Sequence, residues 1–140
     1  MVEDGGSSLT LTPTGAPMMV HADRDRVAQI TLNLISNALR RAPGSPIRLE
    51  LQSAEGMVSC CVADRGSGIG AEHLPHIFER FYRATPLRTD APTGTGVGLT
   101  ISSALARAMG GSLECESIIG VGSRFTLVLP AVDGSLLPRL

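Results

Sequence analysis

Two short glycine-rich segments constrain this chain more than any other feature. DRGSGIG covers residues 64–70 and follows a strand pattern, whereas TGTGVGL covers residues 93–99 and precedes a helical pattern. Glycine clusters beside regular elements often wrap phosphate groups, because the backbone N–H groups can then approach the ligand closely. The two clusters therefore raise the question of which class of nucleotide-binding protein has glycines in this arrangement.

The order of hydrophobic patterns along the chain predicts an α+β fold. The patterns indicate two strands, a helix, a strand pair, the first glycine cluster, a short helix, a long loop, a second helix and two closing strands. The expected positions are 9–12, 18–23, 24–42, 46–52, 57–64, 64–70, 71–82, 83–95, 97–109, 112–117 and 123–130. Strand, helix and strand do not alternate strictly, so we expect a two-layer α/β sandwich, with about three helices on one face of a mixed, mostly antiparallel sheet.

Length and composition are those of one modest domain. The 140 residues suit a single core, which we place at 9–131, with a flexible segment at 1–8 and a tail at 132–140. A net charge of −1 gives no indication of nucleic-acid binding. No signal peptide or apolar run of about 18 residues is evident, so we expect no insertion into a membrane. Cys60, Cys61 and Cys115 lack metal-ligand spacing and are expected to be small buried side chains in a reducing compartment.

The basic residues exclude two familiar glycine-rich sites. All twelve are arginine, and the chain contains no lysine. Both the P-loop and the Ser/Thr/Tyr protein kinases need a lysine that reaches the phosphates, so neither fits. Residues 66–71 do match the dinucleotide fingerprint G-x-G-x-x-[GA], but Pro75 interrupts the helix that should follow. The preceding strand also reads as half of a hairpin, which disfavours a parallel dinucleotide-binding unit.

Two asparagines stand out inside the first predicted helix. Asn33 and Asn37 are four residues apart and therefore share one face of that helix. Their carboxamide oxygens are hard, neutral ligands that suit Mg²⁺ together with substrate phosphates. Taken alone, the pair is more simply explained as structural amides in a buried polar network.

Five sequence boxes in a fixed order resolve the alternatives. They are NLISNALRRAP at 33–43, DRGSGIG at 64–70, IFERFYR at 77–83, TGTGVGLTIS at 93–102 and GVGSRFTLVLP at 120–130. Together they resemble the N, first G, F, second G and last glycine-threonine-type boxes of the ATP-binding catalytic domain of bacterial sensor histidine kinases. That domain belongs to a superfamily shared with DNA gyrase, heat-shock chaperones of the ninety-kilodalton class and mismatch-repair ATPases. The resemblance covers about residues 18–130.

The resemblance implies roles for the residues of the first predicted helix. Asn37 would bind Mg²⁺, and Asn33 would act at the phosphates as a catalytic residue. In hydrolytic relatives a glutamate at the Asn33 position serves as general base, whereas an amide cannot take up a proton at neutral pH. Asn33 therefore favours phosphoryl transfer to a partner over hydrolysis. Arg40 would meet phosphate, and Arg41 would stack on adenine by its planar guanidinium, where relatives often have an aromatic ring.

The two glycine clusters and the loop between them would complete the ATP site. Asp64 would accept a hydrogen bond from the exocyclic amine of adenine, Ile69 would pack on the base, and the glycines would admit base and ribose. The loop at about 83–95 would be the ATP lid, with Arg88 as a catalytic residue that supplies positive charge to the transition state. The other implied ATP-binding residues are Gly66, Gly68, Gly70, Phe81, Arg83, Thr93, Gly94, Thr95, Gly96, Val97, Gly98 and Leu99.

The residues that a complete histidine kinase needs for autophosphorylation are not evident in this chain. His21, His73 and His76 lack the context of a phosphoaccepting histidine, and about 60 residues of helical hairpin would not fit. We therefore expect a partner or a missing domain that carries the histidine, a response regulator downstream, ATP and Mg²⁺ as cofactors, and a cytoplasmic location. The cytoplasmic part of a membrane-bound sensor fits as well. Two alternatives remain: an anti-sigma-factor-type serine kinase of the same fold, or a non-catalytic ATP-binding module.

Overall fold

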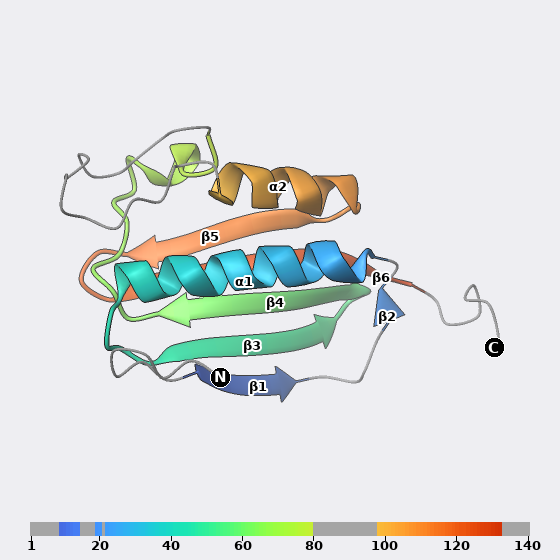
Figure 1. Ribbon diagram of the computed structural model, residues 1–140, viewed down its shortest axis with the longest axis horizontal. Coiled ribbons are helices and arrows are strands. Elements are labelled where there is room, and N and C mark those ends of the chain that lie inside the picture. The colour runs from blue at the N-terminus through green and yellow to red at the C-terminus, as the bar shows by residue number, and fades with distance from the viewer. Residues whose placement is uncertain (1–8, 15–18, 21, 80–97, 133–140) are drawn as a thin grey trace.

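The computed structural model describes residues 9–14, 19–20, 22–79 and 98–132 (Figure 1). The elements follow the order expected from the sequence. They form a six-stranded sheet with two α-helices on one of its faces (Figure 1). The α+β sandwich predicted from the sequence is confirmed.

The first helix, α1, spans Arg24–Arg41 and begins and ends where its flanking residues predict. Asp23 caps the N-terminus, because its Oδ1 accepts hydrogen bonds from the backbone N–H groups of Asp25 at 2.9 Å and Arg26 at 3.3 Å. Ala42 is the C-cap residue, and Pro43 and Gly44 follow it directly. Its buried side chains recur at helical spacing and face the sheet: they are Ile30, Leu34, Ile35 and Ala38.

The sheet is mixed, and among the described strands one pair is parallel. Strand β3 (Ile47–Ala54) turns at Glu55 and Gly56, both with positive φ, into β4 (Met57–Asp64), which confirms the predicted hairpin. The other strands are β1 (Leu9–Thr14), β2 (Met19–Val20), β5 (Ser112–Ile118) and β6 (Gly122–Val132). Strand β1 pairs with β3 in parallel, and β6 pairs antiparallel with β4, β5 and β2.

The second helix, α2, spans Gly98–Ala108 and packs beside α1 (Figure 1). Of the short helix expected within 71–82, the described part forms only the 3-10 turn η2, Leu74–His76. Pro75 lies in the first turn of η2 and has no N–H to continue a helix ladder. Among the described residues there are thus two α-helices and one 3-10 turn, where about three helices were predicted.

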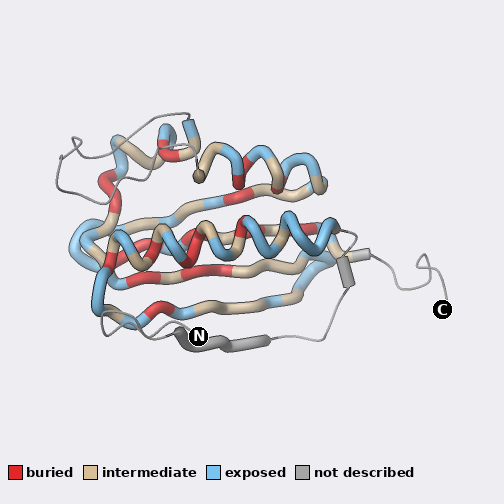
Figure 2. Tube along the Cα trace, viewed as in Figure 1, coloured by how far each residue is buried: buried red, intermediate tan, exposed pale blue. Residues whose placement is uncertain are grey.

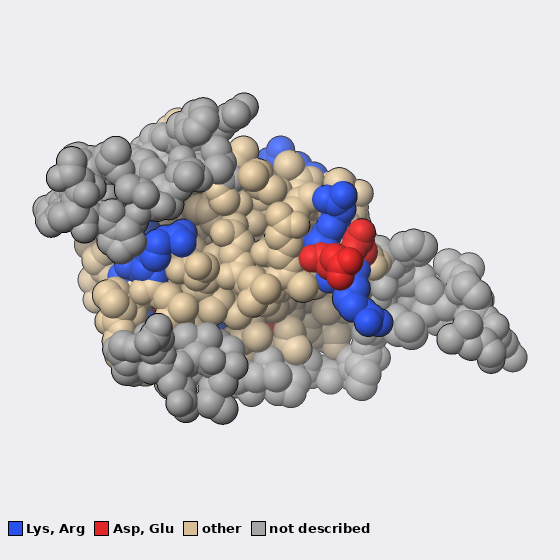
Figure 3. Space-filling view, in the orientation of Figure 1, with Lys and Arg blue, Asp and Glu red and all other residues tan. Residues whose placement is uncertain are grey.

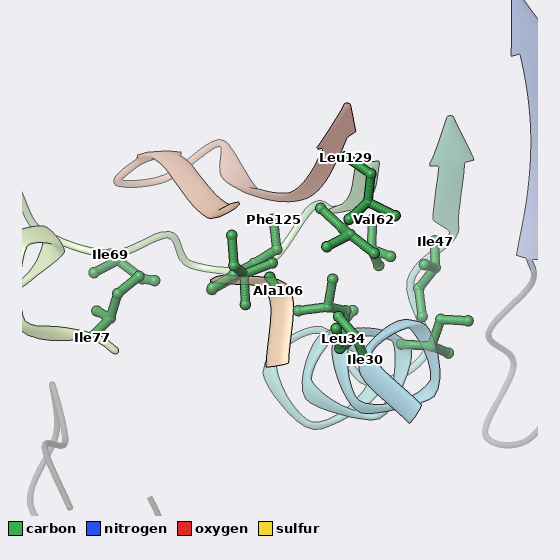
Figure 4. Packing of buried hydrophobic residues seen from close by; sticks show 13 residues of the cluster. Ile30, Leu34, Ile47, Val62, Ile69, Ile77, Ala106, Phe125 and Leu129 are labelled. Carbon is green, nitrogen blue, oxygen red and sulfur yellow. The ribbon is translucent and has the colours of Figure 1, made fainter. Parts of the chain in front are cut away.

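The hydrophobic core lies between the helices and the sheet. Buried residues line the inner side of α1 and the strands behind it (Figure 2). Phe125 and Leu129 of β6 face Leu34 of α1, and Ala106 supplies the small side chain where α2 approaches (Figure 4). Ile69 and Ile77 come from the chain that follows β4 and extend the same core at one edge (Figure 4). The core is aliphatic apart from phenylalanine, as the scarcity of aromatic residues requires.

The three cysteines are free thiols on the sheet. Cys60 packs against the core cluster, whereas the adjacent Cys61 is buried outside it, as alternation along β4 requires. Burial raises the pKa of Cys60 to about 11 and that of Cys115 to about 12. These thiols therefore act as small hydrophobic side chains at neutral pH. Within the described residues, no helix is long and apolar enough to cross a bilayer.

Two leucines of α1 provide a test of this packing. Leu34 is 1% exposed in the core, whereas Leu32 is 65% exposed. We expect Leu34→Ala to lower the free energy of unfolding by about 2–5 kcal/mol, because it leaves a cavity. The matched variant Leu32→Ala should change it by less than about 0.5 kcal/mol. Urea unfolding followed by circular dichroism measures both, and equal losses would contradict the packing.

Candidate nucleotide site

Four segments meet at one end of the sandwich, where β4 ends. They are the C-terminal part of α1, the loop after β4, the turn between β5 and β6, and the start of α2 (Figure 1). The first G box and the last box lie side by side there, because Asp64 at the end of β4 pairs in register with Ser123 near the start of β6. The boxes quoted from the sequence are thus brought together wherever they fall within the described residues.

Asp64 has one carboxylate oxygen without a hydrogen-bond partner. Its side chain is 6% exposed. Oδ1 accepts a hydrogen bond from the backbone N–H of Gly66 at 2.8 Å, and the buried Oδ2 accepts none. An unsatisfied buried acceptor costs about 1–3 kcal/mol, so this oxygen is set to receive a donor from a ligand. The amine expected from adenine is a donor of this kind.

Two serines on the neighbouring strands β6 and β5 lie in register with Asp64. Ser117 Oγ accepts the backbone N–H of Ile69 at 2.7 Å and donates to the carbonyl of Gly122 at 3.0 Å. Ser117 has one hydroxyl hydrogen, which the Gly122 carbonyl receives, so Ser123 is the donor in the 2.8 Å contact between the two hydroxyl groups. The Ser123 oxygen can therefore still accept a hydrogen bond. Neither serine is among the site residues predicted from the sequence. For Ser123, the sequence feature that could have indicated a role is a hydroxyl within the GVGSRF box, at a buried strand position.

The glycines of the first cluster are required by contacts within the protein. Gly68 has φ +82°, and a Cβ there would collide with the carbonyl of Ile118. The N–H of Gly120 donates to the carbonyl of Ser67 at 2.8 Å, and a Cβ on Gly122 would collide with the carbonyl of Asp64. The loop after β4 and the β5–β6 turn thus lie backbone to backbone. The sequence suggested only that these glycines admit a ligand.

The asparagine pair lies against the start of α2. Asn33 Nδ2 donates to Ser102 Oγ at 2.8 Å, and a Cβ on Gly98 would lie 2.9 Å from Asn33 Oδ1. The last glycine of the second cluster is therefore needed for the close approach of the two helices. Asn37 Nδ2 is buried without a hydrogen-bond partner, so this carboxamide is held by no other side chain through its nitrogen.

The last turn of α1 carries two arginines in different settings. Arg41 Nη2 donates to the carbonyl of Gly68 at 3.1 Å, and its buried Nε has no hydrogen-bond partner. Arg40 is exposed. Figure 3 shows basic side chains at this end of the molecule, and mixed basic and acidic side chains at the other end, where Asp23 and Arg26 form an ion pair of 3.7 Å. The predicted stacking of Arg41 on adenine remains a prediction, since its guanidinium here reaches the glycine loop.

The described part of the F box is fixed to the core and to α2. The Phe78 ring contacts Phe125 edge to face, with centroids 6.4 Å apart and planes at 86°. Thr100 Oγ1 donates to the carbonyl of Phe78 at 2.9 Å. Ile69 is buried in the core and Leu99 packs partly against it, while Gly70 is buried in the loop.

The remaining predicted site residues, and the lid at about 83–95 to which most of them belong, lie outside the described residues. They are Phe81, Arg83, Arg88, Thr93, Gly94, Thr95, Gly96 and Val97.

The residues present fit a magnesium–nucleotide complex. Among the described residues no group of three His, Cys, Asp or Glu side chains could hold a metal ion. Mg²⁺ needs few protein ligands when phosphates and water complete its shell, so one carboxamide oxygen suffices. The orphaned atoms of Asp64, Asn37 and Arg41 occur on the elements that meet at this end of the sandwich.

Comparison with known proteins identifies relatives of this arrangement. The family described as histidine kinase-, DNA gyrase B-, and HSP90-like ATPase matches residues 22–133. The sensor histidine kinase MtrB of Mycolicibacterium paratuberculosis is 37% identical over 134 residues, which is 96% of this chain and 24% of that protein. The sensor protein SrrB of Staphylococcus aureus is 38% identical over 109 residues, which is 77% of this chain and 19% of that protein. The chain thus spans about a quarter or less of the length of these curated relatives.

Solved structures agree with the sequence relatives. The mycobacterial sensor histidine kinase MprB superposes with a TM-score of 0.75 at 26% identity, covering 90% of this chain and 83% of that chain. Full-length ShkA, solved in complex with AMPPNP, superposes with a TM-score of 0.80 at 29% identity, covering 94% of this chain and 27% of that chain.

Substitution of two glycines that have the same φ can distinguish the cost of backbone strain from the cost of losing the contact between the loop after β4 and the β5–β6 turn. Gly68 and Gly120 both have φ +82°, but a Cβ on Gly120 would meet nothing within 4 Å. We expect Gly120→Ala to cost about 1–2 kcal/mol from the left-handed conformation alone. Gly68→Ala should cost at least ~2 kcal/mol more, because the loop must separate from Ile118. Thermal and urea unfolding measure both, and similar losses would disprove the importance of the contact.

Proposed function

The chain belongs to the family of histidine kinase-, DNA gyrase B- and HSP90-like ATPases, and on that premise we propose that it is the ATP-binding catalytic domain of a two-component sensor histidine kinase. It would donate the γ-phosphoryl group of ATP to a histidine on a separate dimerisation domain. The relatives named as sensor histidine kinases support this choice within the family.

The observation that carries the proposal is the buried carboxylate of Asp64. A charge-bearing side chain with one satisfied and one unsatisfied oxygen calls for a donor from outside the protein. The exocyclic amine of adenine is a donor, whereas guanine presents a carbonyl oxygen at the same position. The site therefore selects adenine over guanine. The nucleotide analogue named in the ShkA structure is an adenine nucleotide, which agrees with this assignment.

The phosphates would lie toward α2, where Asn33 meets Gly98. Asn37 would hold Mg²⁺ through its carboxamide oxygen, and the ion would neutralise charge on the phosphates. Asn33 is an amide and cannot deprotonate water at neutral pH, so the site favours transfer to a partner over hydrolysis. Arg40, and Arg88 from the segment outside the described residues, would supply the positive charge that the transition state needs.

The phosphoryl acceptor would come from another domain or another chain. A histidine on a helical dimerisation domain would receive the phosphoryl group, and an aspartate of a response regulator would take it next. ATP and response regulators are found in the cytoplasm, so the domain would be cytoplasmic. It could also be the cytoplasmic part of a membrane-bound sensor.

Asp64→Asn tests the nucleotide assignment. The amide replaces an acceptor oxygen with a donor, so we expect the affinity for ATP to fall about ten- to hundredfold. Asp25→Asn is the matched control, because Asp25 is exposed in the first turn of α1, far along the helix from the site. Titration calorimetry measures both, with GTP as a second ligand. Equal affinities in the two variants, or tight GTP binding, would contradict the assignment.

A phosphotransfer assay tests the reaction itself. The chain is incubated with Mg²⁺ and γ-labelled ATP, alone and with candidate histidine-bearing dimerisation domains. Label on the partner that is stable in alkali and lost in acid supports the histidine kinase. Acid-stable label would indicate the serine kinase, and ATP binding without label on any partner would indicate a non-catalytic module.

A further inference from the structure

Ser102 is a buried hydroxyl in the interface between α1 and α2. Its side chain is 2% exposed, and it lies one turn into α2 beyond Gly98. A hydroxyl in a helix interface loses its water contacts and must find a partner within the protein. Its oxygen accepts the Nδ2 hydrogen bond of Asn33 at 2.8 Å, from a residue 69 positions earlier in the chain. The bond joins the N box directly to the helix that follows the second glycine cluster.

The bond determines which end of the Asn33 carboxamide reaches the ligand. The two ends of an amide differ chemically, since one nitrogen donates and one oxygen accepts. Both ends of the Asn33 amide lie near the Cβ position of Gly98, Oδ1 at 2.9 Å and Nδ2 at 3.1 Å. Because Ser102 engages Nδ2, Oδ1 is the end that remains available to a ligand at the start of α2. Without Ser102, a rotation of the amide plane would exchange the two ends, because both are similar in size.

We propose that Ser102 is a positioning residue that holds Asn33 with its acceptor oxygen toward the phosphate end of the site. The inference rests on the proposed function. A carboxamide oxygen is an acceptor and repels phosphate oxygens. Near the phosphates it can therefore bind only a group that donates a hydrogen bond. A water molecule of the Mg²⁺ shell would be that donor, since the ion retains several waters when phosphates bind it. Ser102 thus acts on magnesium-dependent nucleotide binding and leaves recognition of adenine at Asp64 unaffected.

The neighbouring Ser103 provides a matched control. It is also buried, occupies the next position of α2 and has the same side chain. Replacing either serine by alanine removes one buried hydroxyl from the same helix, so a general effect on packing should appear in both variants. An effect on Asn33 should appear only in Ser102→Ala.

The test measures the affinity of the 140-residue chain for Mg²⁺–ATP and for ADP without Mg²⁺ by titration calorimetry. We expect Ser102→Ala to weaken binding of Mg²⁺–ATP about three- to tenfold, the loss of one hydrogen bond, and to leave ADP binding within about twofold. Ser103→Ala should change neither by more than about twofold. The double variant Asn33→Ala/Ser102→Ala should bind Mg²⁺–ATP no more weakly than Asn33→Ala, because Ser102 acts through Asn33.

A spectroscopic measurement reports directly on the hydrogen bond between Asn33 and Ser102. In the ¹⁵N-labelled chain, the side-chain amide protons of Asn33 should exchange with water faster in Ser102→Ala than in the wild type and Ser103→Ala. Equal effects of Ser102→Ala and Ser103→Ala on Mg²⁺–ATP, or additive effects of the Asn33 and Ser102 substitutions, would overturn the inference alone. A wild-type chain that binds neither ATP nor ADP would overturn the proposed function, and the inference with it.

Discussion

The backbone contact between the loop after β4 and the β5–β6 turn is the constraint on which the site depends. Gly68 and Gly122 permit it, and the hydrogen bond from Gly120 N–H to the Ser67 carbonyl fixes its register. This contact places Asp64 beside the serines of β5 and β6, where solvent is excluded and its Oδ2 remains unsatisfied. A looser contact would admit water to the carboxylate, and Oδ2 would then be satisfied by solvent.

The second half of the site depends on how closely two helices approach. Gly98 has no side chain where α2 begins, so the carboxamide of Asn33 reaches that first turn. The small buried residues of α2, Ser102, Ser103 and Ala106, keep the helices close along their length. The half proposed to hold adenine is therefore built from strands and turns, and the half proposed to hold the phosphates is built from helices. Arg41 crosses between them through its bond to Gly68.

Much of this could be predicted from the sequence, because the signals were local. Asp23 and Pro43 marked the ends of α1, the Glu55–Gly56 pair marked the hairpin, and the boxes marked the family. The contacts that explain the glycines could not be predicted in this way. Gly68 meets Ile118 and Gly98 meets Asn33, and no local pattern encodes a partner tens of residues away. Ser102 and Ser117 were missed for the same reason, since a serine within a helix or strand pattern gives no indication of its hydrogen-bond partner.

The topology of the sheet has a consequence for biosynthesis. Strand β6 is the last of the described strands, yet it lies in the interior of the sheet, between β4 on one side and β5 and β2 on the other. It also carries Phe125, Leu127 and Leu129, which form the floor of the core. On the ribosome, the earlier segments emerge with an unpaired edge on β4 and an uncovered helix face. The domain can close only after its final strand has left the exit tunnel, so folding follows synthesis of the domain rather than accompanying it.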